Sequence, residues 1–143
     1  MKKIGFGGFA RVFLVKRKED GLLLALKFIE PKNEKERLII RNELGIMQMN
    51  KDNENIVNCY EAFDFKQRLW IFLEYCDSGC LTPIVEERRG NIPENVCAYI
   101  LYQTLKGLQC LHQRNIMHRD IKSDNILVNT KGDLKLADFG YAA

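Results

Sequence analysis

The sequence contains no apolar run close to the roughly 20 residues that span a membrane, and no signal peptide opens it. No block of like charge is longer than a few residues, and the net charge is only +3. A charge this mild does not indicate a nucleic acid or a membrane surface as the partner. We therefore expect no membrane segment and no nucleic-acid ligand.

Metal-binding patterns of cysteine and histidine are also missing. The five cysteines include no Cys-x-x-Cys pair, and the two histidines do not have a metal-ligand spacing. These absences argue against a zinc site and against a disulfide framework. A reducing compartment, the cytoplasm or the nucleus, is the expected location. The length of 143 residues, with 46% hydrophobic and 29% charged residues, suits one globular domain.

The densest group of polar side chains lies at residues 118–125, which read His-Arg-Asp-Ile-Lys-Ser-Asp-Asn and lead directly into an apolar run at 126–128. Polar groups on a loop that a rigid apolar scaffold holds are often the site of chemistry. We expect short strands at 116–117 and 126–128 on either side of this loop. His118 is expected to be a packed structural residue.

A predicted hairpin connects this loop to the triplet Asp138-Phe139-Gly140. Residues 129–133 turn the chain back into a strand at 134–137, so Asp138 should return towards Asn125. Magnesium prefers oxygen ligands, which Asn125 and Asp138 can provide. Asp120 could accept the proton of an attacking hydroxyl, and Lys122 could neutralise charge on a transferring phosphoryl group.

Two other interpretations of these carboxylates deserve comparison. Glycoside hydrolysis also uses a paired acid and base, but it leaves Lys27, Glu43, Asn125 and the glycine cluster below unexplained. A set of solvated acids does not explain the apolar flanks of the loop.

A glycine cluster comes first in the chain, in residues 4–12, which read Ile-Gly-Phe-Gly-Gly-Phe-Ala-Arg-Val. A strand is predicted to follow it. A two-residue hairpin signal at 19–21 and a returning strand at 22–29 come next. A glycine turn inside a hairpin lets backbone amides approach a phosphate closely, although turn punctuation alone would have the same composition. A dinucleotide fingerprint would need a helix after the glycines.

Lys27 lies inside an apolar strand, and Glu43 lies in the apolar stripe of a helix predicted over 33–50. Asn33 and Glu36 form a capping-box pattern at the start of this helix. The stripe is expected to contain Ile39, Ile46 and Met47. A carboxylate in such a stripe needs a buried cation, which Lys27 could supply.

The remaining elements are predicted from periodicity and turn residues. Strands are expected at 55–65 and 69–74 around a turn at 66–68, and Thr82-Pro83 should open a short helix that Gly90 closes. A long helix is predicted over 93–112. Its apolar positions are Cys97, Ile100, Leu101, Leu105, Leu108 and Leu111.

The order and spacing of these motifs resemble those of protein kinases. The glycine-rich loop has Ala10 where the third glycine is usual. The lysine in Asp120-Ile121-Lys122 resembles Ser/Thr kinases rather than tyrosine kinases. Residues 120–127, together with the Asn-Ile-Val-Asn of 55–58, look most like the STE group of PAK- and MST-like kinases.

The resemblance implies an α+β, protein-kinase-like fold with a five-stranded antiparallel N-lobe and one main helix. The implied divisions are an N-lobe at 1–73, a hinge at 74–79 and an incomplete helical C-lobe at 80–143, ending just after the Asp-Phe-Gly triplet. Leu73 would be the gatekeeper. Arg119 would meet a phosphate on an activation loop that this chain lacks, and the 93–112 helix would leave an apolar patch exposed.

The implied function is ATP- and Mg²⁺-dependent phosphorylation of Ser/Thr hydroxyls in protein substrates, with regulators unknown. Asp120 would act as the base beside Lys122, with Asn125 and Asp138 as metal ligands. The alternative is an inactive short product that only binds nucleotide or partner proteins. The residues expected to contact ATP are Ile4, Gly5, Phe6, Gly7, Gly8, Val12, Ala25, Lys27, Glu43, Glu74, Cys76 and Leu127.

Overall fold

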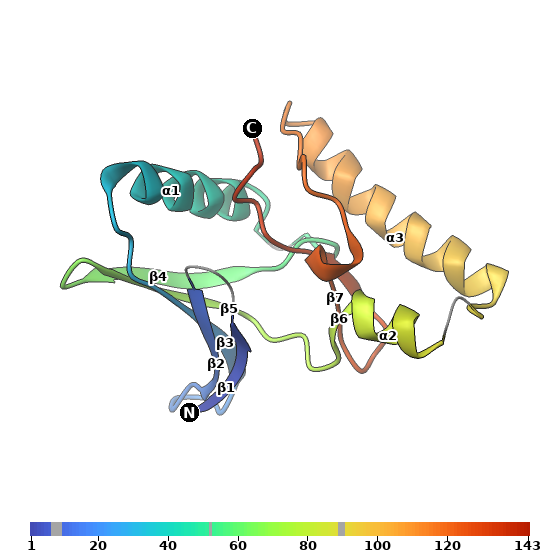
Figure 1. The fold of residues 1–143 in the computed structure, drawn as a ribbon, viewed down its shortest axis with the longest axis horizontal. Coiled ribbons are helices and arrows are strands. Elements are labelled where there is room, and N and C mark those ends of the chain that lie inside the picture. Colours follow the sequence, from blue (N-terminus) through green and yellow to red (C-terminus); the bar gives the residue numbers. More distant parts are fainter. Residues whose placement is uncertain (7–9, 52, 89–90) are drawn as a thin grey trace.

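The computed structural model describes residues 1–6, 10–51, 53–88 and 91–143 (Figure 1). A five-stranded sheet with one long helix forms the first part, and the helices and short strands of the second part follow it. The elements of the first part are β1 (Lys2–Phe6), β2 (Ala10–Lys16), β3 (Leu23–Ile29), α1 (Glu34–Met49), β4 (Cys59–Phe65) and β5 (Arg68–Glu74). Those of the second part are β6 (Gly79–Cys80), α2 (Leu81–Glu87), α3 (Glu94–His112), the 3-10 turn η1 (Ser123–Asn125), β7 (Ile126–Val128) and β8 (Leu134–Leu136).

The large sheet has the strand order β1-β2-β3-β5-β4, and every pairing in it is antiparallel. The helix α1 lies across one face of this sheet (Figure 1). Lys27 is opposite Val12 on β2 and Ile71 on β5, so it occupies the centre of the sheet. The predicted α+β class and the five-stranded antiparallel sheet are therefore confirmed.

The helix α1 starts as predicted, because the backbone N–H of Glu36 donates to Asn33 Oδ1 at 2.9 Å. Of its predicted buried face, Glu43, Ile46 and Met47 are buried, but Ile39 is not. Ile39 is 42% exposed, whereas its neighbour Ile40 is 6% exposed. Both spacings, of four and of three residues, align with Glu43, so packing on the sheet selects Ile40.

Two hairpin turns differ from their predicted lengths. The turn between β2 and β3 is longer than two residues, because the Asp20 carboxylate accepts from both the Arg17 guanidinium and the Leu22 N–H and so stabilises a wider loop. The turn between β4 and β5 contains only Lys66 and Gln67, with φ values of 52° and 63°. Two positive φ angles are typical of a type I′ hairpin.

The strand β4 begins at Cys59 rather than at residue 55, because the chain just before it pairs elsewhere. Val57 N donates to Leu136 O at 2.9 Å, and Leu136 N donates to Asn55 O at 2.8 Å. Residues 55–57 therefore run beside β8 and join the two parts of the molecule. Ile56 and Leu136 are each only 1% exposed at this junction.

The short helix α2 begins at Leu81 with Cys80 as its N-cap, so the predicted capping role of Thr82 is wrong. The Thr82 hydroxyl instead lies 2.8 Å from Ser123 Oγ and 2.9 Å from Asp124 Oδ1, which occupies it away from the helix end. Gly90, the predicted end of this helix, lies outside the described residues.

The predicted strand at 116–117 is also wrong, since these residues belong to no strand. Met117 instead exchanges two backbone hydrogen bonds with Ala143, at 2.8 and 3.1 Å. One pair of residues is not enough to form a β-ladder, so no strand results.

The helix α3 is confirmed almost to the residue, with Pro93 as its N-cap. Its buried face contains Gly107, where an added Cβ would lie 2.8 Å from Leu136 Cδ1 and 2.9 Å from Asn55 O. This close approach sets α3 directly against β8 and the 55–57 segment. On the opposite side, Leu101 and Leu105 are 62% and 60% exposed, which is the expected apolar patch. In the part of the chain that the structure describes, no helix is long and apolar enough to cross a bilayer.

Candidate active site

A cavity of about 320 Å³ lies where the large sheet, α1 and the second part of the chain meet. Residues of β1, β2 and β3 line one part of it. Residues 73–76, which form the end of β5 and the two positions after it, line another part. Leu127 and Asp138 come from the second part. The predicted site residues that line the cavity are Ile4, Gly5, Val12, Ala25, Lys27, Glu43, Glu74, Cys76, Leu127 and Asp138.

The Lys27–Glu43 ion pair that the sequence predicts is formed. Lys27 Nζ donates to Glu43 Oε1 at 2.6 Å, and the two side chains are 18% and 6% exposed. The pair links the centre of β3 to the buried face of α1. A positive group is thereby held at the wall of the cavity in one orientation.

Glu74, the last residue of β5, lines the cavity with Tyr75 and Cys76, and contacts of its backbone and side chain hold it in place. Glu74 N donates to Asn58 O at 2.8 Å, and Lys135 Nζ lies 3.0 Å from Glu74 Oε1. Cys76 is buried, and burial raises the pKa of its thiol to about 12. This thiol is therefore protonated and poorly nucleophilic at neutral pH.

Three side chains of the polar loop contact one another. Asp120 Oδ2 accepts from Lys122 Nζ at 2.8 Å and from Asn125 Nδ2 at 2.9 Å. The hydrogen bond from Lys122, followed by that from Asn125, holds the pKa of Asp120 below its ordinary value. The Asp120 carboxylate is therefore ionised at neutral pH and can accept a hydrogen bond or a proton.

His118 lies beneath this loop and is only 2% exposed. Its Nε2 lies 3.1 Å from Ala137 O, and Asp120 N donates to its Nδ1 at 3.4 Å. The two contacts are compatible with a neutral ring that carries its proton on Nε2. Burial lowers the pKa of His118, and the ring packs 5.1 Å from that of Phe139. The predicted structural role of His118 agrees with this packing.

Asn125 and Asp138 are brought together by the β7–β8 hairpin, as predicted. Ala137 N donates to Asn125 O at 2.9 Å, which places Asp138 one residue away from this bond. The Asn125 Nδ2 donates to both Asp120 O and Asp120 Oδ2, so the amide oxygen is directed to the other side of the group. Asp138 has φ = 64°, and its Oδ1 accepts weakly from Gly140 N at 3.4 Å.

Both groups offer oxygen ligands, the donor type that Mg²⁺ prefers. Among the described residues, no group of three or more His, Cys, Asp and Glu could enclose a metal ion. A donor set of this size suits an ion that takes most of its ligands from phosphate and water.

Three predicted site residues cannot be placed in full. Gly7 and Gly8 lie outside the described residues, and the side chain of Phe6 is also outside them, although Phe6 ends β1. Arg119 is described, and its Nε donates to Tyr141 O at 2.6 Å. The cavity also has lining residues that the predicted site did not include, namely Met47, Val57, Leu73, Tyr75, Gly79, Cys80 and Ala137.

Comparisons with known proteins agree on one family. The sequence model of the protein kinase domain matches residues 1–143. The serine/threonine-protein kinases pakA and pakC of Dictyostelium discoideum are 38% and 40% identical to the chain over 144 and 145 residues. Each match covers 100% of the chain, which spans 12% of pakA and 30% of pakC.

Proposed function

The chain belongs to the protein kinase family, and from this premise we propose that it binds Mg²⁺-ATP and transfers the γ-phosphoryl group to Ser/Thr hydroxyls of proteins. The observation that carries the proposal is that one cavity is lined by the Lys27–Glu43 pair, by residues 74–76 at the end of β5 and by Asp138. These groups are the ones that a nucleotide triphosphate needs at its phosphates, its base and its metal ion.

The adenine would bind at the end of the cavity that residues 74–76 close. Backbone N–H and C=O groups there can pair with the edge of a base, and the apolar side chains of Val12, Ala25 and Leu127 line the same cavity. An apolar slot with a few fixed polar groups is the usual form of a small-molecule site.

The phosphates would meet Lys27. Glu43 holds the ammonium at 2.6 Å, so the lysine does not need to be ordered when the nucleotide binds. Asn125 and Asp138 would hold Mg²⁺, which supplies charge neutralisation at the phosphate oxygens.

Asp120 would orient the substrate hydroxyl and accept its proton. Its lowered pKa keeps it ionised, and the hydrogen bond from Asn125 fixes the carboxylate in the loop. Lys122 can neutralise charge that develops on the transferred group, since its ammonium is already 2.8 Å from Asp120. The names of the two relatives support Ser and Thr as the acceptor residues.

Thermal unfolding of the 143-residue chain with Mg²⁺-ATP tests the nucleotide site. A ligand that binds only the folded state at about 100 times its dissociation constant stabilises that state by about 2.7 kcal/mol, so the melting temperature should rise. The Lys27→Met variant should lose this rise, whereas Lys16→Met, at an exposed position of β2, should keep it. No rise in the wild-type chain at millimolar Mg²⁺-ATP would contradict the proposal.

Phosphoryl transfer is tested separately with a serine-containing protein and labelled ATP. The expected product is phosphoserine, and Asp120→Asn should abolish it while leaving the Mg²⁺-ATP melting shift in place. Nucleotide binding without transfer by the wild-type chain would instead favour a protein that only binds nucleotide.

A further inference from the structure

A further lysine–carboxylate pair lies at the edge of the cavity, and the proposed reaction does not use it. Lys135 Nζ on β8 is 3.0 Å from Glu74 Oε1 at the end of β5. The side chains are 11% and 22% exposed, so most of both groups is withdrawn from water. An ion pair buried to this degree persists only if both charges stay matched.

Glu74 is held from two directions. Its Oε2 accepts from Asn58 N at 3.3 Å while its Oε1 faces Lys135, and its own N–H donates to Asn58 O. The backbone of Glu74 belongs to the segment that closes the cavity. The carboxylate contacts and the backbone hydrogen bond thus hold the same residue of the cavity lining.

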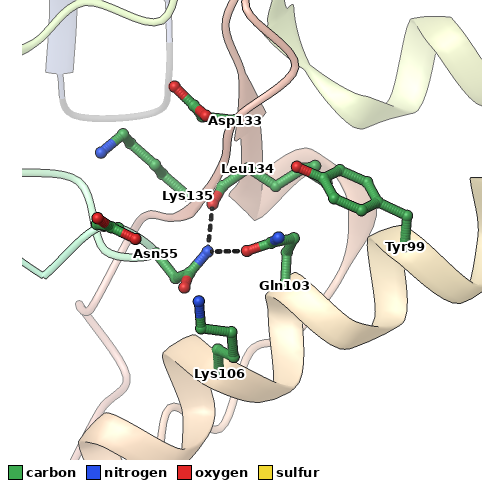
Figure 2. Close-up of a pocket in the computed structure, with 8 residues that line it drawn as sticks. Asn55, Tyr99, Gln103, Lys106, Asp133, Leu134 and Lys135 are labelled. Carbon is green, nitrogen blue, oxygen red and sulfur yellow. Dashed lines mark hydrogen bonds between the residues drawn. The ribbon is translucent and has the colours of Figure 1, made fainter.

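Lys135 is equally constrained on its own strand. Leu134 O accepts from Asn55 Nδ2, which also donates to Gln103 Oε1 on α3 (Figure 2). Leu136 makes the two backbone hydrogen bonds with Asn55 and Val57. In Figure 2 the Lys135 side chain extends away from α3, whereas Gln103 reaches from α3 towards β8.

The chain from Lys135 to the metal-binding position is short. Asp138 follows Lys135 by three residues, and the intervening Leu136 and Ala137 are fixed by backbone hydrogen bonds to residues 55, 57 and 125. The Glu74–Lys135 contact thus connects the end of β5, where the adenine would bind, to β8, which leads to Asp138.

We propose that Lys135 is a positioning residue for nucleotide binding, and that its ion pair with Glu74 sets the adenine-binding backbone relative to Asp138. This inference rests on the proposed nucleotide site. Lys135 touches no reacting atom; it acts through Glu74. Without Lys135, the Glu74 carboxylate loses its cation, and it can regain hydration by moving its side chain together with the end of β5 that carries it.

The test compares binding of adenosine and of Mg²⁺-ATP to the full chain by calorimetry. Melting curves are recorded first, so that each variant is measured where it is folded. Lys135→Met should weaken both ligands by about tenfold, the equivalent of one charge-assisted hydrogen bond. Lys27→Met should weaken Mg²⁺-ATP far more than adenosine, because Lys27 serves the phosphates. Lys131→Met makes the same substitution at an exposed position of the same hairpin and should change neither affinity.

Two further variants separate positioning from a loss of stability. Lys135→Arg keeps the charge and should bind adenosine within about twofold of the wild type. The double variant Lys135→Met with Glu74→Gln removes both charges, and it should bind adenosine more tightly than Lys135→Met alone. If Lys135→Met does not fold, Glu74→Gln alone takes its place, with a matched loss for both ligands expected.

The outcomes distinguish the two proposals. Unchanged adenosine affinity in folded Lys135→Met, or equal losses in the single and double variants, would overturn the positioning role while leaving the nucleotide site intact. If the wild-type chain binds neither adenosine nor Mg²⁺-ATP, the proposed function fails, and the positioning role fails with it.

Discussion

Two lysine–carboxylate pairs of the candidate site have nearly equal lengths but very different surroundings. Lys27 and Glu43 are 2.6 Å apart with side chains 18% and 6% exposed, whereas Lys122 and Asp120 are 2.8 Å apart with side chains 49% and 23% exposed. The first pair joins a strand to a helix, and the second lies within one loop. Distance alone therefore does not describe what each pair contributes.

Burial decides the difference. A buried charge that loses its partner has little water to replace it, so removing one member of the buried pair should destabilise the fold. When an exposed ion pair is broken, water replaces the lost contacts at little cost. Holding two long side chains together also costs conformational entropy, so such a pair contributes little to stability. We therefore expect Lys27–Glu43 to couple site and stability, and Lys122–Asp120 to serve the site alone.

The largest expected effect comes from removing Lys27. Lys27→Met leaves the Glu43 carboxylate buried without its cation, which should lower the free energy of unfolding by about 3 kcal/mol. Urea denaturation without nucleotide measures this directly. The companion variant Lys27→Met with Glu43→Leu removes both charges and should recover most of the loss. A single variant as stable as the wild type would show that Glu43 does not depend on Lys27 for charge compensation.

The sequence revealed the two pairs through different signals. Lys27 and Glu43 were each out of place in an apolar pattern, and each misplaced charge explained the other. Asp120 and Lys122 were apparent from the local density of polar residues between apolar flanks. Both signals are local, or depend on only one long-range partner, so a single sequence can carry them.

Other features depend on several segments at once and could not be predicted. Ile40 rather than Ile39 is buried because the arrangement of α1 on the sheet selects the face. Thr82 had the composition of a helix cap, but Ser123 and Asp124 bind its hydroxyl from 41 and 42 residues away. Gly107 is required by the approach of β8, which no pattern within α3 indicates. In each case tertiary packing outweighs the local preference.

The Glu74–Lys135 pair shows the same limit. Lys135 lies in a strand whose alternation of apolar and polar residues is ordinary, and no pattern in the sequence connects it with Glu74. The pair becomes visible only when β5 and β8 are placed together.

A change of pH should have a smaller effect on folding stability. This effect distinguishes buried titratable groups from exposed ones. His118 lies directly under Asp120, facing Ala137 O, Asp138 and Phe139, and burial lowers its pKa below the ordinary 6.5. Below about pH 6.5 the unfolded chain gains a proton at this position that the folded chain does not bind. Stability is therefore complete above that pH and declines as the pH falls towards the folded-state pKa.

Melting temperatures measured across this range should decline on acidification. The decline should be shallower in His118→Gln, which has no titrating group at this position, while exposed His112 is common to both proteins. Equal slopes in the two proteins would mean that His118 is not responsible. Because the pKa of Asp120 is held below 3.8, the exposed pair should contribute only in more acidic solution, outside the range in which His118 titrates.

The smallest expected effect on stability comes from Lys122→Met, although it removes the partner of the proposed base. The Asn125 amide still donates to the Asp120 carboxylate at 2.9 Å, so this carboxylate keeps one hydrogen-bond partner. The melting temperature should therefore change no more than in Lys131→Met, an exposed lysine of the β7–β8 turn. The Mg²⁺-ATP melting shift should also remain, because Lys27 is intact, while phosphoryl transfer should fall sharply through loss of charge neutralisation at the transferred group. If Lys122→Met were as unstable as Lys27→Met, the loop would depend on its ion pair as much as the strand and helix depend on theirs. Exposure would then not explain the difference between the two pairs.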